Sequence, residues 1–176
     1  MRRIGYTLPV ILVFSGACSR LPESFPPPPQ RAALAVLPAG SLGYAFSMED
    51  ASVGDYLVQD FQDRGTSPWR WTYAHPVLRF FVPEAPRLNF TMDFTIPPQT
   101  FRDTGPVTLT LRVNGALLDR HRCSQPGQQH YSHGVPNNLL RSNAINFVAI
   151  DPDPVWVSSD DGTRLGFILS RAGFTE

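Results

Sequence analysis

The feature that most constrains this chain is a strict alternation of apolar and polar residues in two neighbouring segments. Residues 88–96 read LNFTMDFTI, with an apolar side chain at every second position, and residues 107–113, VTLTLRV, repeat the pattern. Side chains of a β-strand point alternately to its two faces, so both segments are predicted to be strands with one buried and one solvated face. Sheets with a solvated face are typically antiparallel.

Turn residues divide the following sequence into further short strands. Asn114–Gly115 predicts a tight hairpin turn, with residues 116–122 as the return strand. Residues 145–150, INFVAI, are apolar on both faces and are predicted to lie centrally in a sheet. A second turn, Asp160–Gly162, leads into a last strand over residues 163–174.

Little helix is expected anywhere in the chain. Residues 52–61 fit a strand or a strand with a bulge, and only residues 136–142 suggest a short helical turn. Seven to nine short strands, together with 18 prolines and 13 glycines, indicate an all-β fold. We therefore predict an antiparallel β-sandwich, with a jelly-roll arrangement of its strands.

Several of these segments also carry a family resemblance. The stretches PVTLTLRVNGALLDRHRCSQPGQQHYSHGVP, LLRSNAINFVAI and DDGTRLGFILSRAGF resemble the galactose-binding-like β-sandwich, over roughly Tyr44 to Phe174. Domains of that kind accompany polysaccharide hydrolases and glycosyltransferases as carbohydrate-binding or accessory modules. The resemblance rests on turns and core positions, so it speaks to the fold and leaves the ligand open.

The N-terminus has the layout of a secretory signal peptide over residues 1–17. Two arginines precede an apolar run from Ile4 to Phe14, which is too short to span a bilayer. The run ends in SGAC, which resembles the lipobox of bacterial lipoproteins, where the peptide is cut before the cysteine and the cysteine carries the lipid. The resemblance implies lipidation of Cys18. An ordinary cleaved signal with an incidental cysteine is the alternative.

A proline-rich segment follows the signal. Residues 18–34 contain four consecutive prolines, Pro26–Pro29, which favour extended polyproline geometry. We expect a lipidated cysteine and a tether here, followed by the β-sandwich domain over residues 35–176. The expected location is the cell envelope, with the protein lipid-anchored and periplasmic or outer-membrane associated.

Composition and motifs argue against two classes of function, nucleic-acid binding and catalysis. The 15 basic residues balance the 15 acidic ones, so nothing points to a nucleic-acid partner. If Cys18 carries a lipid, Cys123 has no disulfide partner and is expected to be buried. No G-x-S-x-G motif is present and no base is evident for Cys123, so no catalytic residue and no enzyme activity are predicted.

The segment SPWRWTYAHPVLRFFVP, residues 67–83, is the main candidate for a binding surface. Leu78, Phe80 and Val82 fit a core face, and the residues between them fit the opposite face. Two alternatives remain open. The aromatic and arginine side chains form a sugar platform, or the tryptophans close the end of the core and leave Arg79 and Phe81 more accessible. The candidate ligand-binding residues here are Trp69, Trp71, Tyr73, Arg79 and Phe81.

Two further groups of residues are candidate sites. His130 and Tyr131 are candidates for a sugar site, whereas His130 and His133 lie three apart on a strand and therefore face opposite ways, so no metal is predicted there. Asp-Pro and Asp-Gly pairs in residues 151–162 are typical of turns, and we interpret them in that way. The alternative is that their carboxylates bind a structural calcium ion. No cofactor is predicted.

These observations favour a membrane-tethered, non-catalytic lipoprotein that binds carbohydrate or accompanies a polysaccharide-handling machine. The expected partners are a glycan or polysaccharide and, through the lipid, the membrane. The alternative is a structural or assembly lipoprotein that contacts another envelope protein through an exposed aromatic face. A small glycan hydrolase is the third possibility.

Overall fold

The computed structural model of the protein describes residues 42–63, 65, 67–83 and 87–176. The expected signal peptide, Cys18 and the proline-rich tether lie outside these residues. Within them, no helix has the length and apolar character needed to cross a membrane.

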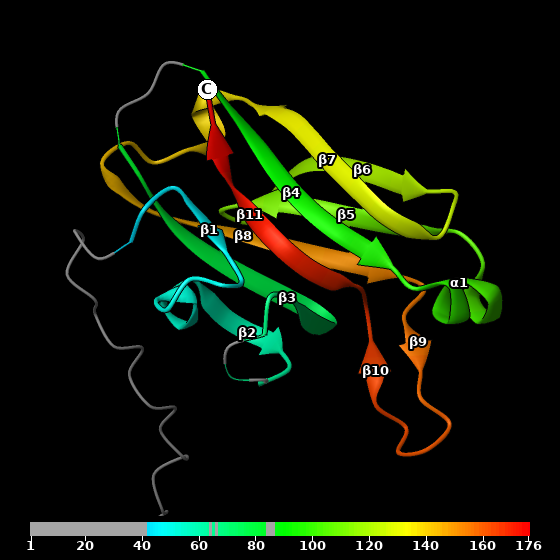
Figure 1. Cartoon of the computed structure of the whole chain (residues 1–176). Coiled ribbons are helices and arrows are strands. Elements are labelled where there is room, and N and C mark those ends of the chain that lie inside the picture. The colour runs from blue at the N-terminus through cyan, green and yellow to red at the C-terminus, as the bar shows by residue number, and fades with distance from the viewer. Residues whose placement is uncertain (1–41, 64, 66, 84–86) are drawn as a thin grey trace, which may run out of the picture. The chain divides into compact units, whose positions relative to one another are not determined.

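The described chain consists mainly of antiparallel strands (Figure 1). The strands are β1 (Ala45–Ser47), β2 (Leu57–Phe61), β3 (Arg70–Val82), β4 (Leu88–Ile96), β5 (Val107–Val113), β6 (Ala116–Cys123), β7 (Gly127–Val135), β8 (Ala144–Asp153), β9 (Trp156–Val157), β10 (Arg164–Leu165) and β11 (Ile168–Thr175). One helix, α1 (Pro98–Thr104), and two 3-10 turns, η1 (Val53–Asp55) and η2 (Asn137–Leu139), complete the described elements.

The strands form two layers that pack face to face. One layer has the order β1–β11–β4–β7 and the other the order β2–β3–β8–β5–β6. The layers are joined on one side, because β11 also pairs with the start of β3 at Trp71 and Ile168. The β9–β10 hairpin projects from the sandwich as a separate two-stranded sheet. The chain is therefore an all-β, antiparallel jelly-roll sandwich, as the alternation predicted.

The alternation of the sequence determines which side chains fill the core. In β4 and β5 every apolar position is buried and every polar position between them is half-buried. The core is rich in aromatic rings: Phe174 packs edge-on against Phe80 and Phe90, with ring centroids 5.4 Å apart in both pairs. Such pairs contribute about 0.5–1.5 kcal/mol each beyond the area that they bury.

The central strand β8 confirms the expectation for residues 145–150, since it lies between β3 and β5. Its inward row is not purely apolar, because Asn146 is fully buried. The Asn146 amide donates to the carbonyls of Arg141 and Ala144 and accepts from the Asn114 side chain and the Arg141 N–H, all within 3.0 Å. Every polar atom of this side chain is satisfied, and Asn146 thereby holds the Asn114–Gly115 turn against β8.

Three elements differ from the sequence-based expectations. Residues 52–61 begin with the 3-10 turn η1, and β2 starts only at Leu57. The expected last strand is split into β10 and β11 at Gly166, where a Cβ atom would lie 2.7 Å from Thr72 Oγ1. Helix α1 was not predicted. It starts at consecutive prolines, ends before Gly105 in the left-handed region (φ 73°), and buries only Thr100.

The core assignment leads to a stability prediction. Phe90→Ala and Leu109→Ala each remove a fully buried side chain, so we expect losses of about 3–5 and 2–5 kcal/mol in the free energy of unfolding. Thr110→Ala alters a half-buried side chain on the other face of β5, and we expect a change within about 0.5 kcal/mol. Urea denaturation of the three variants measures these values. Equal losses would mean that the faces of β5 are assigned wrongly.

Candidate functional site

The outer face of β3 carries most of the residues that the sequence selected. Leu78, Phe80 and Val82 point into the core and are buried, as expected. Trp71, Tyr73, His75, Val77, Arg79 and Phe81 occupy the alternate positions and therefore share the outer face. Trp69 directly precedes the strand and is half-buried.

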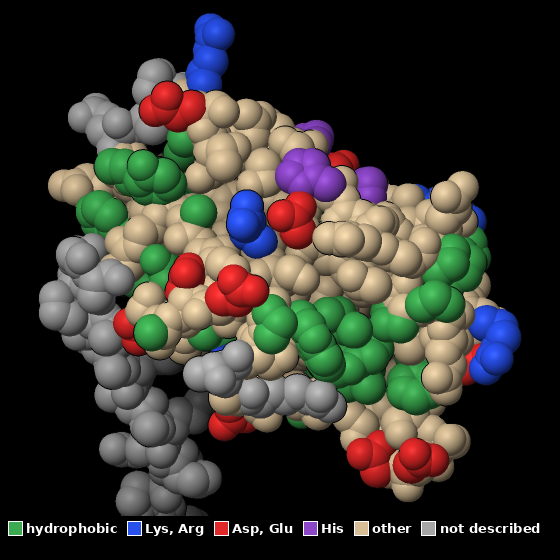
Figure 2. Space-filling model, viewed as in Figure 1, with side chains coloured by type: hydrophobic (Ala, Val, Ile, Leu, Met, Phe, Trp, Pro, Cys, Tyr) green, Lys and Arg blue, Asp and Glu red, His purple; other side chains and the backbone are tan. Residues whose placement is uncertain are grey.

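The tryptophans are not part of the core. Trp71 and Tyr73 are half-buried, and they belong neither to the buried cluster nor to the half-buried side chains that pack against it in the described part of the chain. Figure 2 shows hydrophobic side chains gathered at the surface where β3 begins and β10 ends. The alternative in which these rings close the core is therefore not supported.

The expected difference in accessibility stays a prediction, because Trp69, Trp71, Arg79 and Phe81 are all half-buried. Arg79 and Phe81, the pair expected to be more accessible, each contact other parts of the protein. Arg79 Nε donates a hydrogen bond to the backbone carbonyl of Asp55 in η1, and Phe81 packs against the core cluster. The guanidinium thus ties η1 and the start of β2 to β3.

Neighbouring strands extend this surface. Arg79 lies opposite Phe147 of β8, and Thr110 of β5 lies opposite Asp151 of β8. Directly paired residues share a face of the sheet. The residues of this surface, which we call the outer β3–β8–β5 face, are Trp71, Tyr73, His75, Val77, Arg79, Phe81, Thr110, Arg112, Phe147, Ala149 and Asp151. Phe147 is 36% exposed, which is unusual for a phenylalanine in a central strand.

A polar network crosses the middle of this face. The His75 ring Nδ1 lies 3.0 Å from Asp151 Oδ1, and Arg112 Nε lies 3.9 Å from the other carboxylate oxygen of Asp151. The His75 backbone N–H donates to Asp60 Oδ2 at 2.8 Å. The sequence carries no local signal for this group, because His75 and Asp151 come together only through the pairing of β3 with β8.

His130 and Tyr131 lie apart from this face, on the edge strand β7 of the other layer. The His130 ring Nδ1 is 2.6 Å from Asp93 Oδ1 on β4, and Arg171 of β11 is opposite Asp93. Figure 2 shows basic, acidic and histidine side chains next to one another over β11, β4 and β7. His130 is thus placed on a polar, solvated surface.

Tyr131 faces the interior and is buried. Its hydroxyl donates to Asp119 Oδ2 at 3.1 Å, and the same oxygen is 3.5 Å from His133 Nδ1. Burial, followed by the negative charge of Asp119 and this hydrogen bond, raises the pKa of Tyr131 well above its usual range. Tyr131 and His130 therefore point to opposite faces, and we leave Tyr131 out of the proposed site.

The acidic residues of 151–162 have separate roles, and Asp151 lies in strand β8 and not in a turn, as was expected of it. Asp151 pairs with His75, while Asp161 accepts the Thr163 N–H at 2.9 Å, and its hydrogen bonds to Thr163 and Ser158 lower its pKa. Among the described residues, no three His, Cys, Asp or Glu side chains are grouped as metal ligands would be. Cys123 is buried and free, and burial raises its pKa to about 11.

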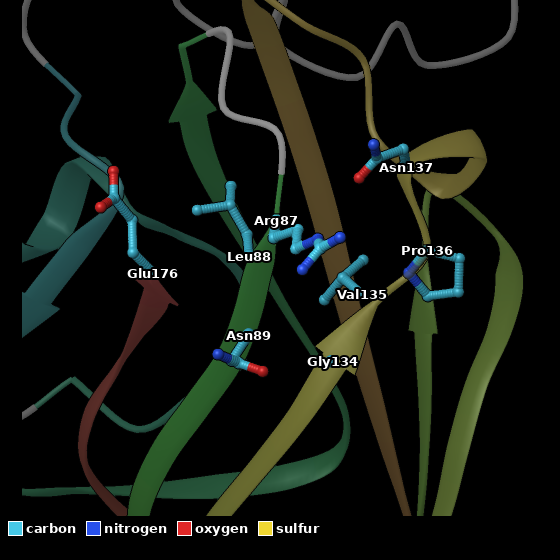
Figure 3. Close-up of a pocket in the computed structure, with 8 residues that line it drawn as sticks. All are labelled: Arg87, Leu88, Asn89, Gly134, Val135, Pro136, Asn137 and Glu176. Carbon is cyan, nitrogen blue, oxygen red and sulfur yellow. The ribbon is translucent and has the colours of Figure 1, made fainter.

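A separate pocket of about 600 Å³ lies where β4 begins and β7 ends (Figure 3). Its walls combine one arginine, two asparagines, a glutamate and apolar side chains. The lining residues are Arg87, Leu88, Asn89, Gly134, Val135, Pro136, Asn137 and Glu176. None of them was selected from the sequence, where isolated asparagines and a glycine carry no signal.

Comparison with known proteins adds little to this description. No family model matches the chain, and no curated protein matches it. Solved structures that resemble it include a family 35 carbohydrate-binding module, Xyl-CBM35, in complex with a disaccharide that contains glucuronic acid (12% identity, 76% of this chain and 94% of that chain, TM-score 0.42). Another is the carbohydrate-binding module CBM36 in complex with calcium and xylotriose (12% identity, 74% and 98%, TM-score 0.39).

Larger proteins resemble the chain only over a part of their length. The chain spans 19% of a family GH115 4-O-methyl-α-glucuronidase with specificity for decorated arabinogalactans (11% identity, 89% of this chain, TM-score 0.43). It spans 31% of an acetyl xylan esterase from the rumen bacterium Butyrivibrio proteoclasticus and 11% of latent PorU from Porphyromonas gingivalis. At these identities and TM-scores the likeness says nothing about a ligand, and the fold assignment rests on the strand pairing described above.

The contact of Arg79 with η1 leads to a second prediction. Arg79→Ala leaves the Asp55 carbonyl without its guanidinium donor, so we expect unfolding free energy to fall by about 1–2 kcal/mol. Arg120→Ala changes an exposed arginine of β6, and we expect a change within about 0.5 kcal/mol. Chemical denaturation compares the two variants. An Arg79→Ala protein as stable as Arg120→Ala would show that the contact contributes nothing.

Proposed function

We propose that this protein is a membrane-tethered, non-catalytic lipoprotein that binds a polysaccharide along the outer β3–β8–β5 face. One observation carries the proposal: aromatic rings that do not pack on the core flank a polar network on the same face. Trp71 and Tyr73 precede His75 along β3. Phe147 of β8 lies on the other side of His75, opposite Arg79.

The chemistry of this face suits a sugar polymer. The C–H faces of a pyranose ring pack on aromatic side chains, whereas its hydroxyls need donors and acceptors at fixed positions. The Asp151 carboxylate accepts hydrogen bonds and the Arg112 guanidinium donates them. His75 is largely exposed, with 69% of its side chain accessible, so its ring is within reach of a ligand.

The length of the face favours a chain over a single sugar. From residue 71 to residue 81, β3 extends by about 33 Å at the rise of an ordinary strand. The aromatic and polar groups are distributed along this line, so a monosaccharide would contact only a small part of them. We therefore assign the face to an extended polysaccharide.

The proposed tether is consistent with this role. Polyproline geometry extends by about 3.1 Å per residue, so residues 18–34 would give a reach on the order of 50 Å from a lipid on Cys18. That reach would allow a binding face to meet a polymer beyond the membrane surface. We place the protein in the cell envelope, anchored by Cys18.

Binding to another envelope protein is the competing function, and the exposed Phe147 and Leu117 favour it. Exposed apolar side chains also mark protein interfaces. A panel of polysaccharides distinguishes the two functions, because it contains no protein. Binding to the panel supports a polysaccharide ligand, and its absence favours a protein partner.

The binding test uses the full-length chain in detergent micelles. We expect Trp71→Ala and Phe147→Ala to weaken binding to a polysaccharide from an array by about 3- to 10-fold each, since a stacked ring contributes about 0.5–1.5 kcal/mol. Val157→Ala, which alters an exposed apolar residue of the β9–β10 hairpin, should leave binding unchanged. If no polysaccharide binds, or if both ring variants bind as the parent does, the proposed face is wrong.

The tether is tested separately. We expect Cys18→Ser to abolish labelling by a fatty-acid probe and to release the protein from the membrane fraction, while the circular dichroism spectrum stays that of a β-protein. Fractionation and probe labelling measure both effects. A Cys18→Ser protein that still takes up the probe would rule out lipidation at this cysteine.

A further inference from the structure

The pocket between the start of β4 and the end of β7 is open because one of its floor positions is a glycine. Gly134 lies opposite Asn89, and Leu88 lies opposite Val135, in the pairing of these strands. A Cβ atom placed on Gly134 would meet only Asn89 Oδ1, at an ordinary contact distance of 3.6 Å. Gly134 is therefore not required by the fold, and a side chain there would project into the pocket.

The positive charge of this pocket has no ion-pair partner among the described residues. Arg87 is exposed, and in the described part of the chain no carboxylate forms an ion pair with it. Figure 3 shows its guanidinium extending over Val135, whereas Glu176 lies on the other side of Leu88 and its carboxylate points away. A guanidinium presents a planar fork of donors that matches a carboxylate in a bidentate arrangement.

Two neutral amides flank the guanidinium. The side chains of Asn89 and Asn137 both line the pocket, and neither makes a hydrogen bond to another side chain or to the backbone of the described residues. Each offers both a donor and an acceptor. Such groups recognise hydroxyls, which also donate and accept.

The remaining wall is apolar. Leu88, Val135 and Pro136 line the pocket; Leu88 and Val135 are buried in the core, and Pro136 is exposed. The volume of about 600 Å³ falls within the range of sites that enclose small molecules, roughly 300–1,000 Å³. An inorganic anion would leave most of this wall and both amides without a contact.

We propose that this pocket binds a sugar acid, that is, a hydroxylated ring that carries one carboxylate. The carboxylate pairs with Arg87, the hydroxyls bond to Asn89 and Asn137, and a C–H face of the ring packs on the exposed Pro136. None of the lining residues belongs to the outer β3–β8–β5 face, so this inference does not depend on polysaccharide binding there.

Calorimetric titration of the full-length chain in detergent micelles tests the proposal. The probes are glucuronate, galacturonate, glucose, acetate and inorganic phosphate. We expect at least one of the two uronates to saturate the protein, and glucose, acetate and phosphate to bind at least about 10-fold more weakly, because each lacks one of the recognised groups.

Two variants with matched controls locate the site. Arg87→Gln should weaken uronate binding about 10-fold or more, because the neutral amide cannot replace the charged fork. Gly134→Val should weaken it at least as much by filling the floor, while the melting temperature stays close to that of the parent. Ser132→Val, on the same outer row of β7 but outside the pocket, and Arg171→Gln should leave the affinity unchanged, as should Trp71→Ala.

The remaining outcomes overturn the proposal. If neither uronate saturates the protein, the pocket takes no sugar acid. If acetate or phosphate binds as tightly as the uronates, the site recognises an anion alone. If Arg87→Gln retains full affinity, the binding lies elsewhere, and this holds even if Gly134→Val does not fold. Loss of uronate binding in Trp71→Ala would place the ligand on the outer face instead.

Discussion

The packing of one phenylalanine ring determines how the rest of the molecule is arranged. Phe80 of β3 contacts four other aromatic side chains, with ring centroids between 5.4 and 6.1 Å away: Phe46, Tyr56, Phe90 and Phe174. These rings come from β1, the turn before β2, β4 and β11. A shift of β3 by one residue would turn Phe80 to solvent and Arg79 into the core, so this cluster fixes the register of the strand. The cluster thereby determines which residues of β3 face the core and which face outward.

The fixed register explains why the outer surface of β3 is so unlike its inner one. Once Leu78 and Phe80 are buried, the residues between them are presented outward together with those of β8. The tryptophan and tyrosine at the start of the strand are placed outside the core by the same alternation. Both rings are half-buried there, so part of each remains available for contact with a ligand.

Much of the fold could be read from the sequence because its main signals are local. The alternation in β4 and β5 and the Asn114–Gly115 turn, with φ values of 50° and 86°, each depend on a few consecutive residues. Helix α1 was missed because it buries one residue and has no periodicity. The inward position of Tyr131 follows from the period of two, yet its apolar and polar neighbours on β7 do not alternate clearly enough to reveal it.

The candidate sites were harder to predict, since they depend on contacts between distant segments. His75 meets Asp151 across 76 residues, and Arg79 bonds to a carbonyl 24 residues earlier in the chain. The pocket at Gly134 exists because a side chain is absent opposite Asn89, which only the pairing of β4 with β7 reveals.

Hydroxyl-radical footprinting with mass spectrometry tests the central claim, that the outer row of β3 is a contact surface and not core. We expect Trp71, Tyr73 and Phe147 to be oxidised in the free protein and protected by a bound polysaccharide, with Phe80 unmodified throughout. Trp71 as unreactive as Phe80, or unprotected by the bound polymer, would contradict it.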